Sequence, residues 1–152
     1  MAKLLEGRLL ADKIKEEIKL EVASLKSKPV LASILIGDDL SSVAYVKSQA
    51  KTAQGLGIIY KLQQLDRDIT EHALLDFILG LNADKTVNGI IVQMPLPKII
   101  NYKLVSECIS PLKDIEGIHP LNMGKIFFSQ ANLVPCTAAA VMELLNSTGV
   151  DL

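Results

Sequence analysis

Short apolar runs typical of buried strands alternate along this chain with longer segments that carry apolar residues at helical spacing. The run Val30–Ile36 is apolar and partly β-branched, and it stops at Gly37-Asp38-Asp39, as a buried strand would. Strands that alternate with helices favour an α/β fold in which right-handed crossovers join parallel strands. We therefore expect a three-layer α/β domain with a mostly parallel sheet flanked by helices. The expected order is a helix at about 8–26, a strand at 30–36, a helix at about 42–56, a strand at 58–62, a helix at about 70–81 and a strand at 90–92.

Each helical segment carries one apolar stripe, which we expect to face the interior. Thr70 or Asp68 is expected to cap the helix at 70–81, and Thr137 to cap a final helix that starts at about 137. The wholly apolar run 90–92 suits a central parallel strand that is covered on both faces. The expected inward positions are Leu10, Ile14, Ile18, Val22 and Leu25; Val43, Val46, Ala50 and Ala53; Leu74, Leu75, Ile78 and Leu81; and Val141, Leu144 and Leu145.

Composition argues against several classes of partner. The chain has 152 residues, 49% of them hydrophobic, which suits one domain with a sizeable core. Its 16 basic and 17 acidic side chains form no basic cluster, so we expect no nucleic-acid partner. No apolar run reaches the roughly 18 residues of a membrane span and no signal-peptide core is present, so we expect no membrane association and a cytoplasmic location. Cys108 and Cys136 have neither metal-binding nor disulfide spacing, and we expect no metal.

Polar side chains gather where a ligand site is expected. Ligands of parallel sheets bind beyond the carboxyl ends of the strands, and the segments that leave those ends here are 37–39, 65–68 and 93–97. The segment Lys113–Gly124, which we call the 113–124 loop, combines charged, imidazole and amide side chains with two glycines outside any hydrophobic period. Packing does not account for such a composition, so this loop is the first candidate for function.

Four segments of the chain follow one another in a characteristic order: Gly37-Asp38-Asp39 with Ser42-Val43-Ala44-Tyr45-Val46, Gly89 through Pro97, Lys113 through Gly124, and Pro135-Cys136-Thr137. Together they resemble the bifunctional methylenetetrahydrofolate dehydrogenase/methenyltetrahydrofolate cyclohydrolase family. The resemblance implies that residues 1–152 are the N-terminal catalytic domain, which binds the folate substrate. It also implies NADP as cofactor, bound mainly by a Rossmann domain that this chain lacks, a homodimeric full-length enzyme, and a place in one-carbon metabolism and purine biosynthesis.

The resemblance also assigns residues to the site. Tyr45 matches the tyrosine that meets the pterin ring, and Gln93 matches a glutamine at a strand end, so Tyr45, Gln49 and Gln93 are the expected catalytic residues. Helical periodicity places Tyr45 and Gln49 on one face of their helix. The expected substrate-binding residues are Tyr45, Gln93, Pro95, Leu96, Glu116 and Gly117, and Cys136 and Thr137 are expected near the nicotinamide.

Gln49 departs from the family, which has a lysine four residues after the tyrosine. An amide cannot gain or lose a proton at neutral pH, and loss of a general acid or base costs on the order of 10² to 10⁴ in rate. Lys47 and Lys51 do not replace it, because each lies about 160° round the helix from Gln49. We therefore expect weak or absent cyclohydrolase activity, whereas hydride transfer, which is the cofactor's chemistry, is expected to survive.

Other positions in the motifs refine this picture. Glu116 stands where the family has aspartate, and we hypothesise that Gln49 and Glu116 are paired adjustments of one pocket. Ile99 stands where many members have histidine, and it is expected only to pack. Asp114 is expected to shape the 113–124 loop, and His119 to hold that loop against a short helix that follows.

Two other interpretations stay open. A non-catalytic folate-binding or assembly domain would suit a chain without a cofactor domain, and no dehydrogenase turnover is expected from the isolated chain because it lacks a glycine-rich dinucleotide turn. A phosphoacceptor receiver module is also an α/β domain and would use Asp38 and Asp39. That interpretation does not account for the 113–124 loop, and the strand at 90–92 leads to Gln93 instead of the required aspartate.

Overall fold

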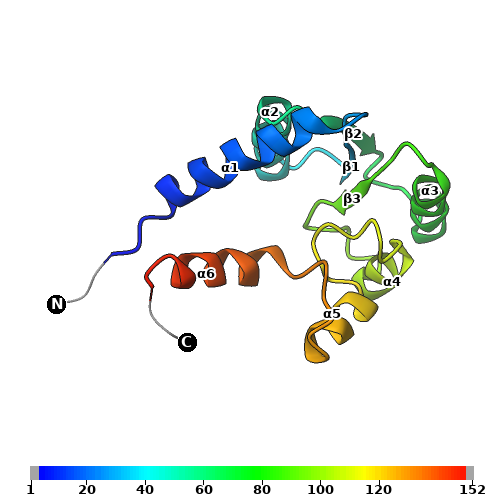
Figure 1. Cartoon of the computed structure of the whole chain (residues 1–152). Helices are drawn as coiled ribbons and strands as arrows, with labels where there is room; N and C mark the ends of the chain where they lie inside the picture. The colour runs from blue at the N-terminus through cyan, green and yellow to red at the C-terminus, as the bar shows by residue number, and fades with distance from the viewer. Residues whose placement is uncertain (1–3, 150–152) are drawn as a thin grey trace.

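The computed structural model describes residues 4–149, which form three strands and six helices (Figure 1). Every element expected between residues 8 and 92 is present, with ends shifted by no more than three residues. No helix in the described part of the chain is both long and apolar enough to cross a membrane. The elements are α1 (Gly7–Ser24), β1 (Val30–Ile36), α2 (Leu40–Gly55), β2 (Ile59–Leu65), α3 (Glu71–Ala83), β3 (Gly89–Val92), α4 (Tyr102–Cys108), α5 (Pro120–Phe127) and α6 (Cys136–Asn146).

The three strands form a parallel sheet in the order β2-β1-β3, which confirms the expected α/β class. The central strand is β1, so the expectation that residues 90–92 form a central strand is wrong. The run is nevertheless fully buried, because the backbone beside Asp114 pairs with Ile90 and covers the outer edge of β3. The amide of Ile90 donates to the carbonyl of Lys113 at 2.7 Å. The 113–124 loop is therefore attached directly to the sheet.

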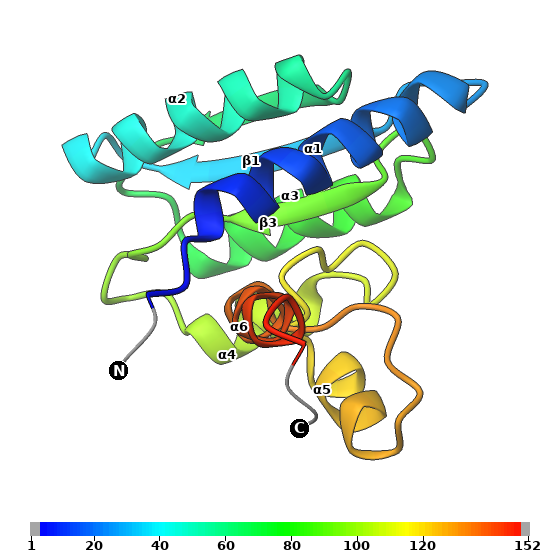
Figure 2. The same cartoon turned by 60° about the vertical axis from the view of Figure 1, so that its left-hand side comes forward.

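Helices cover both faces of the sheet. Figure 2 shows α2 on one side of the strands and α3 on the other. Because side chains alternate along a strand, Ala32, Ile34 and Ile36 point to one face, where they join the main core. Leu74 and Ile78 of α3 complete that core and are fully buried, and Thr70 caps α3 as expected.

The opposite face of the sheet, which lies under α2, is less uniformly apolar. Val46 and Ala53 of α2 are buried, as their stripe predicts. The alternate positions of β1 include Ser33, which has no exposed surface at all. A polar side chain in the middle of a buried strand requires hydrogen-bond partners, and this one finds them in the site described below.

Two short helices lie beyond the sheet. The seven-residue helix α4 was not expected, since so short a segment carries too little periodicity to reveal itself. Its Val105 belongs to the main core, and Asn101 caps it by accepting from the amide of Lys103. The other helix, α5, is the short helix expected after His119.

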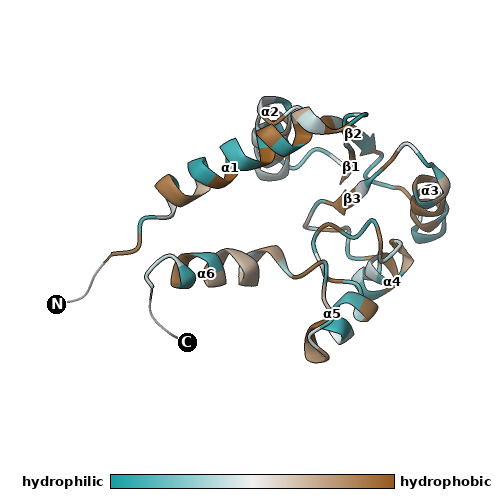
Figure 3. Ribbon diagram, in the orientation of Figure 1, coloured by the Kyte–Doolittle hydropathy of each residue, from teal (hydrophilic) through white to brown (hydrophobic). Residues whose placement is uncertain are grey.

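The first and last helices extend away from the sheet and have no buried residues (Figure 1). The stripe of α1 is half-buried except at Leu25, which is 53% exposed and was wrongly expected to face inward. Val141 of α6 was also expected to be buried, but it is 50% exposed because α6 leaves the sheet after the segment at 129–135. Brown and teal residues alternate along α1 in Figure 3. The ends of α1 and α6 meet where Gly7 approaches Leu144.

Candidate active site

Asp39 organises the first turn of α2. Its Oδ1 accepts hydrogen bonds from the backbone amide of Ser42 at 3.0 Å and from the hydroxyl of Ser41. The bond from the Ser41 hydroxyl lowers the pKa of Asp39 most, and the bond from the Ser42 amide lowers it further. The carboxylate is therefore charged at the positive end of the helix. The Ser42 hydroxyl also lies 3.1 Å from the carbonyl oxygen of Met94, which ties α2 to the segment that leaves β3.

Gln49 is the centre of a polar group between α2 and the sheet. Its Oε1 accepts from the hydroxyl of Tyr60 at 2.9 Å and from Nε2 of Gln93 at 2.8 Å. The Gln93 Nε2 also donates to the hydroxyl of Ser33 at 3.0 Å. Gln93 is only 4% exposed. We call these four residues, Ser33, Gln49, Tyr60 and Gln93, the Gln49 cluster.

The strand register explains why these side chains meet. Ser33 pairs with Leu62 on β2 and with Ile91 on β3. Tyr60 lies two residues before Leu62 and Gln93 two residues after Ile91, so both point to the face that Ser33 occupies. Sequence motifs indicate Gln49 and Gln93 as site residues but not Ser33 or Tyr60. The one available signal was that Ser33 is a polar residue inside an otherwise apolar strand.

Tyr60 keeps its proton at neutral pH. Burial raises the pKa of Tyr60, and the nearby Tyr45 raises it further, against an opposing effect of a hydrogen bond with Ser33. The hydroxyl of Tyr60 therefore remains a donor. Tyr45 itself lies one helical turn before Gln49 and is 60% exposed, and its hydroxyl makes no hydrogen bond within residues 4–149. The aromatic ring of Tyr45 is thus open to solvent beside the Gln49 cluster.

The segment after Gln93 lines a cavity at the carboxyl edge of the sheet. This segment begins with a cis peptide bond between Met94 and Pro95. Leu96 packs against the main core, while Pro95 is exposed. The expectation that Ile99 packs is wrong, because Ile99 is 70% exposed and the adjacent Ile100 enters the core instead. The cavity has a volume of about 440 Å³ and is lined by Ile36, Gly37, Asp38, Asp39, Arg67, Asp68, Pro95, Leu96, Pro97, Lys98 and Ile99.

Asp114 gives the 113–124 loop its shape. It is 1% exposed, and its Oδ2 accepts from the backbone amide of His119 at 2.8 Å and from Nδ2 of Asn122 at 2.9 Å. His119 in turn caps α5, because its Nδ1 accepts from the amide of Leu121 at 3.0 Å. The structural roles expected for Asp114 and His119 are therefore confirmed.

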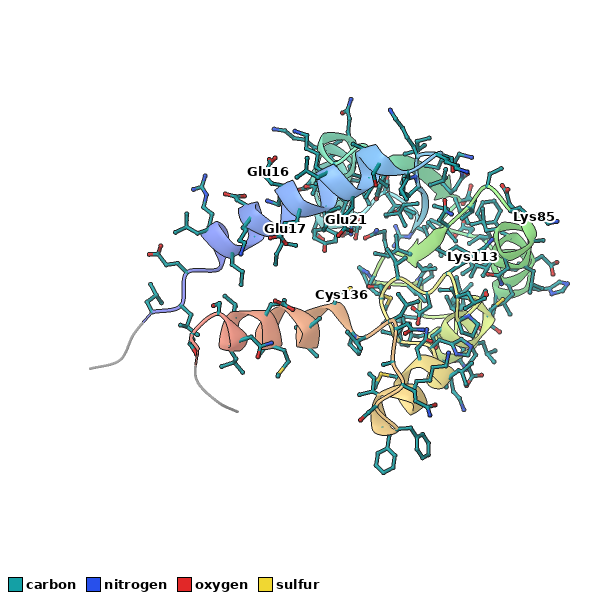
Figure 4. The ribbon with its side chains drawn as sticks, viewed as in Figure 1. Glu16, Glu17, Glu21, Lys85, Lys113 and Cys136 are labelled. Atoms are coloured by element: carbon teal, nitrogen blue, oxygen red, sulfur yellow. The ribbon has the colours of Figure 1, made fainter. Side chains whose placement is uncertain are left out.

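Lys113 anchors the same loop to the end of α3. Its Nζ donates to the carbonyl oxygens of Leu81 at 2.9 Å, Asn82 at 2.7 Å and Asp84 at 2.7 Å. Figure 4 shows Lys113 between the loop and α3, with Lys85 farther out. The last carbonyls of a helix have no partner within the helix, and a cation there also complements the helix dipole.

Glu116 is half-buried and has no hydrogen-bond partner within residues 4–149. Burial raises the pKa of Glu116, and the neighbouring Asp114 adds to the effect. Burial raises the pKa of Tyr102 and of Cys136, and the charge of Glu116 raises both further. These two side chains therefore lie near Glu116. No sequence motif indicates Tyr102 as a site residue, because it belongs to the unexpected helix α4.

Gly117 brings this loop against the segment that leads to α6. Its φ is +66°, and a Cβ at this position would lie 2.3 Å from the carbonyl carbon of Val134. The thiol of Cys136 donates to the carbonyl of Ile115 at 3.3 Å, and Figure 4 shows Cys136 at the start of α6. The expectation that Thr137 caps α6 is wrong. Thr137 is exposed and lies inside the helix, which already begins at Cys136.

The candidate site therefore consists of two groups: Tyr45 with the Gln49 cluster, and Glu116 with Tyr102 and Cys136. No hydrogen bond joins the two groups in the described part of the chain. The first offers neutral donors and acceptors, and the second offers one carboxylate. Within residues 4–149 no three His, Cys, Asp or Glu side chains are grouped so that they could hold a metal ion.

A parallel sheet with amides, a carboxylate and an exposed tyrosine near its carboxyl end is typical of an α/β domain that binds a small polar molecule. Comparison with known proteins narrows this class. The chain belongs to the tetrahydrofolate dehydrogenase/cyclohydrolase catalytic-domain family, whose model matches residues 5–116. The phosphoacceptor interpretation is therefore wrong, in agreement with the use of Asp39 as a helix cap.

Individual relatives support this assignment. The chain is 49% identical to a bifunctional protein FolD of Heliobacterium modesticaldum, over 99% of this chain and 54% of that protein. A FolD crystal structure from Campylobacter jejuni superposes with a TM-score of 0.95 at 42% identity, over 98% of this chain and 54% of the other. The Trypanosoma brucei enzyme, solved with NADP cofactor and an inhibitor, gives 0.89 at 35% identity, over 98% and 52%. The chain thus spans about half the length of these relatives.

Proposed function

We propose that residues 1–152 form the folate-binding catalytic domain of a methylenetetrahydrofolate dehydrogenase. In this proposal the domain binds methylenetetrahydrofolate for NADP-dependent oxidation to methenyltetrahydrofolate. The observation that carries it is Glu116, a half-buried carboxylate without a protein partner in the described part of the chain. A carboxylate of this kind is costly unless it is paired, and the amide and amino groups of a pterin supply the required donors.

The other site residues have complementary roles in the proposal. Tyr45 offers an exposed aromatic face against which a planar ring can stack. Gln49 and Gln93 hydrogen-bond and orient the folate, and Pro95 and Leu96 border it. Gly117 allows the backbone beside Glu116 to lie against the segment at 134–135.

The cofactor is held mainly by a domain outside this chain, in our proposal. Cys136 and Thr137 open helix α6 with an exposed threonine and a thiol directed at a backbone carbonyl, which suits contact with a nicotinamide edge but offers no pyrophosphate site. When bound, the cofactor supplies the hydride acceptor. This chain binds and orients the substrate, so on its own it is expected to lack dehydrogenase turnover.

Hydrolysis of methenyltetrahydrofolate is expected to be weak, because Gln49 cannot exchange a proton. Gln49→Lys should raise the rate of hydrolysis by on the order of 10², measured as the loss of methenyltetrahydrofolate absorbance. Failure of the lysine variant to gain activity would show that Gln49 is not the limiting feature.

Calorimetric titration with 5-formyltetrahydrofolate tests the main proposal. The chain should bind this ligand, and Tyr45→Ala and Glu116→Gln should each weaken binding by about tenfold or more. Glu16→Gln on the exposed face of α1 is the matched control and should leave affinity unchanged. Absence of binding by the unmodified chain would contradict the proposal.

A non-catalytic folate-binding or assembly domain is the second candidate, favoured by the non-titratable Gln49. Folate binding without any turnover, even with a cofactor domain present, would support it. We further propose that the full-length enzyme is a cytoplasmic homodimer. Sedimentation of the full-length protein tests the subunit number.

A further inference from the structure

All side-chain hydrogen bonds of Gln49 within residues 4–149 are made by its amide oxygen, Oε1. Oε1 accepts from Tyr60 and from Gln93, which uses both lone pairs that a carbonyl oxygen possesses. Nε2 of Gln49 makes no hydrogen bond within residues 4–149. No buried side-chain nitrogen or oxygen in this part of the chain lacks a partner, so the Gln49 Nε2 must reach solvent.

The exposed nitrogen lies on the side of α2 that Tyr45 occupies. The two residues are four positions apart in the helix and therefore share a face. The amide of Gln49 thus has its oxygen directed inward and its two N–H groups directed outward beside an exposed aromatic ring.

The neighbours of Gln49 select this orientation. Tyr60 can donate a proton and keeps it, because burial raises the pKa of its hydroxyl. Gln93 offers Nε2, which is held in place by its second bond to the fully buried hydroxyl of Ser33. Turning the Gln49 amide over would set its N–H groups against the N–H groups of Gln93 and would remove that hydrogen bond, while the Tyr60 hydroxyl would have to accept instead of donate.

We propose that Tyr60 and Ser33 are positioning residues that hold the Gln49 amide as an outward-facing N–H donor. The site then selects a ligand with a hydrogen-bond acceptor, such as a carbonyl oxygen or a ring-nitrogen lone pair, at the point that Gln49 faces. This inference rests on the proposed function only for the identity of that ligand as a folate. The orientation itself is a property of the free protein.

Hydrogen exchange of the side-chain amides, followed by nuclear magnetic resonance, tests the orientation without any ligand. In the unmodified chain the Gln49 amide protons should exchange as freely as an exposed glutamine, while those of Gln93 should be protected. Tyr60→Phe should lower the protection of Gln93 by about fivefold, since one hydrogen bond of the cluster is lost. Protected Gln49 protons in the unmodified chain would overturn the inference.

Ser33 allows a matched pair of variants. Ser33→Thr and Ser33→Val have nearly the same volume at a fully buried position, and only threonine keeps the hydroxyl. The threonine variant should preserve the protection of Gln93, whereas the valine variant should lose about fivefold. Equal protection in both variants, together with no effect of Tyr60→Phe, would refute the positioning role.

Folate affinity then separates this inference from the proposed function. Tyr60→Phe should weaken binding of 5-formyltetrahydrofolate by about fivefold. Ser48 is an exposed neighbour of Gln49 whose side chain makes no hydrogen bond within residues 4–149, so Ser48→Ala should have no effect. If the exchange pattern is as expected and no folate binds, the proposed function fails and the positioning role stands. If folate binds equally well to Tyr60→Phe, the outward donor is not used for recognition.

Discussion

Replacing Lys113 by methionine should destabilise the chain through the end of α3. The ammonium group donates to three backbone carbonyls, at distances of 2.7–2.9 Å, and methionine keeps most of the side-chain length without the donors. Asp84, the C-terminal flanking residue of α3, supplies one of these carbonyls. The carbonyls of Leu81 and Asn82 would lose this donor, Asp84 would keep only the bond from the backbone amide of Val87, and the 113–124 loop would lose its attachment to α3.

The magnitude follows from the number of bonds. A neutral hydrogen bond contributes about 1 to 1.5 kcal/mol to stability in net terms, and a bond from a charged donor contributes at least as much. Three such bonds give about 3 to 4.5 kcal/mol for Lys113→Met. In a chain of this size that loss corresponds to a fall in Tm of roughly 6–18 °C.

Urea unfolding followed by circular dichroism measures this loss. Lys85→Met is the matched control, because Lys85 follows the same helix end but is exposed and makes no hydrogen bond in the described part of the chain. The control should stay within about 0.5 kcal/mol of the unmodified chain. A loss below about 1 kcal/mol for Lys113→Met, or an equal loss in both variants, would refute the argument that Lys113 anchors the loop.

Three further predictions concern the residues near the loop. Burial raises the pKa of Glu116 above its ordinary value of 4.5, so the stability that protonation of this group contributes is present below pH 4.5 and is lost as pH rises through the raised pKa. Glu116→Gln should therefore stabilise the chain at pH 7 but not at pH 4 in thermal melts, and Glu16→Gln should do neither. Gly117→Ala should cost about 2–4 kcal/mol in urea unfolding because its Cβ would lie 2.3 Å from backbone, whereas Gly124→Ala, with open space around it, should cost nothing. For the paired-adjustment hypothesis, Gln49→Lys and Glu116→Asp should each weaken folate binding, and the double variant should weaken it by less than the two combined; additive free energies would contradict the hypothesis.

Local patterns were sufficient to predict the main elements of the sheet layer. The apolar run at 30–36 and the stripes of α2 and α3 are strong periodic signals, and Thr70 has the side chain that a helix cap requires. Helix α4 escaped prediction because its seven residues span only two turns. The central position of β1 also escaped, since strand order depends on which edges pair in space.

The residues of the candidate site also divide into those that sequence motifs identify and those that only the fold brings together. Gln49, Gln93 and Glu116 were named from motifs in which they occupy recognisable positions along the chain. Tyr60 and Tyr102 were not, because nothing in their immediate neighbours marks them. The strand register brings Tyr60 to Gln49, and the docking of α4 brings Tyr102 to Glu116.

The sequence by itself determined the α/β class and the family, because these depend on residue identity and on spacing along the chain. The tertiary structure alone decided that Lys113 holds the end of α3 and that Asp114 covers the edge of β3. It also decided that the side-chain oxygen of Gln49 is hydrogen-bonded while its nitrogen has no partner among residues 4–149. Such features depend on hydrogen bonds between residues far apart in sequence. Local periodicity carries no information about those partners.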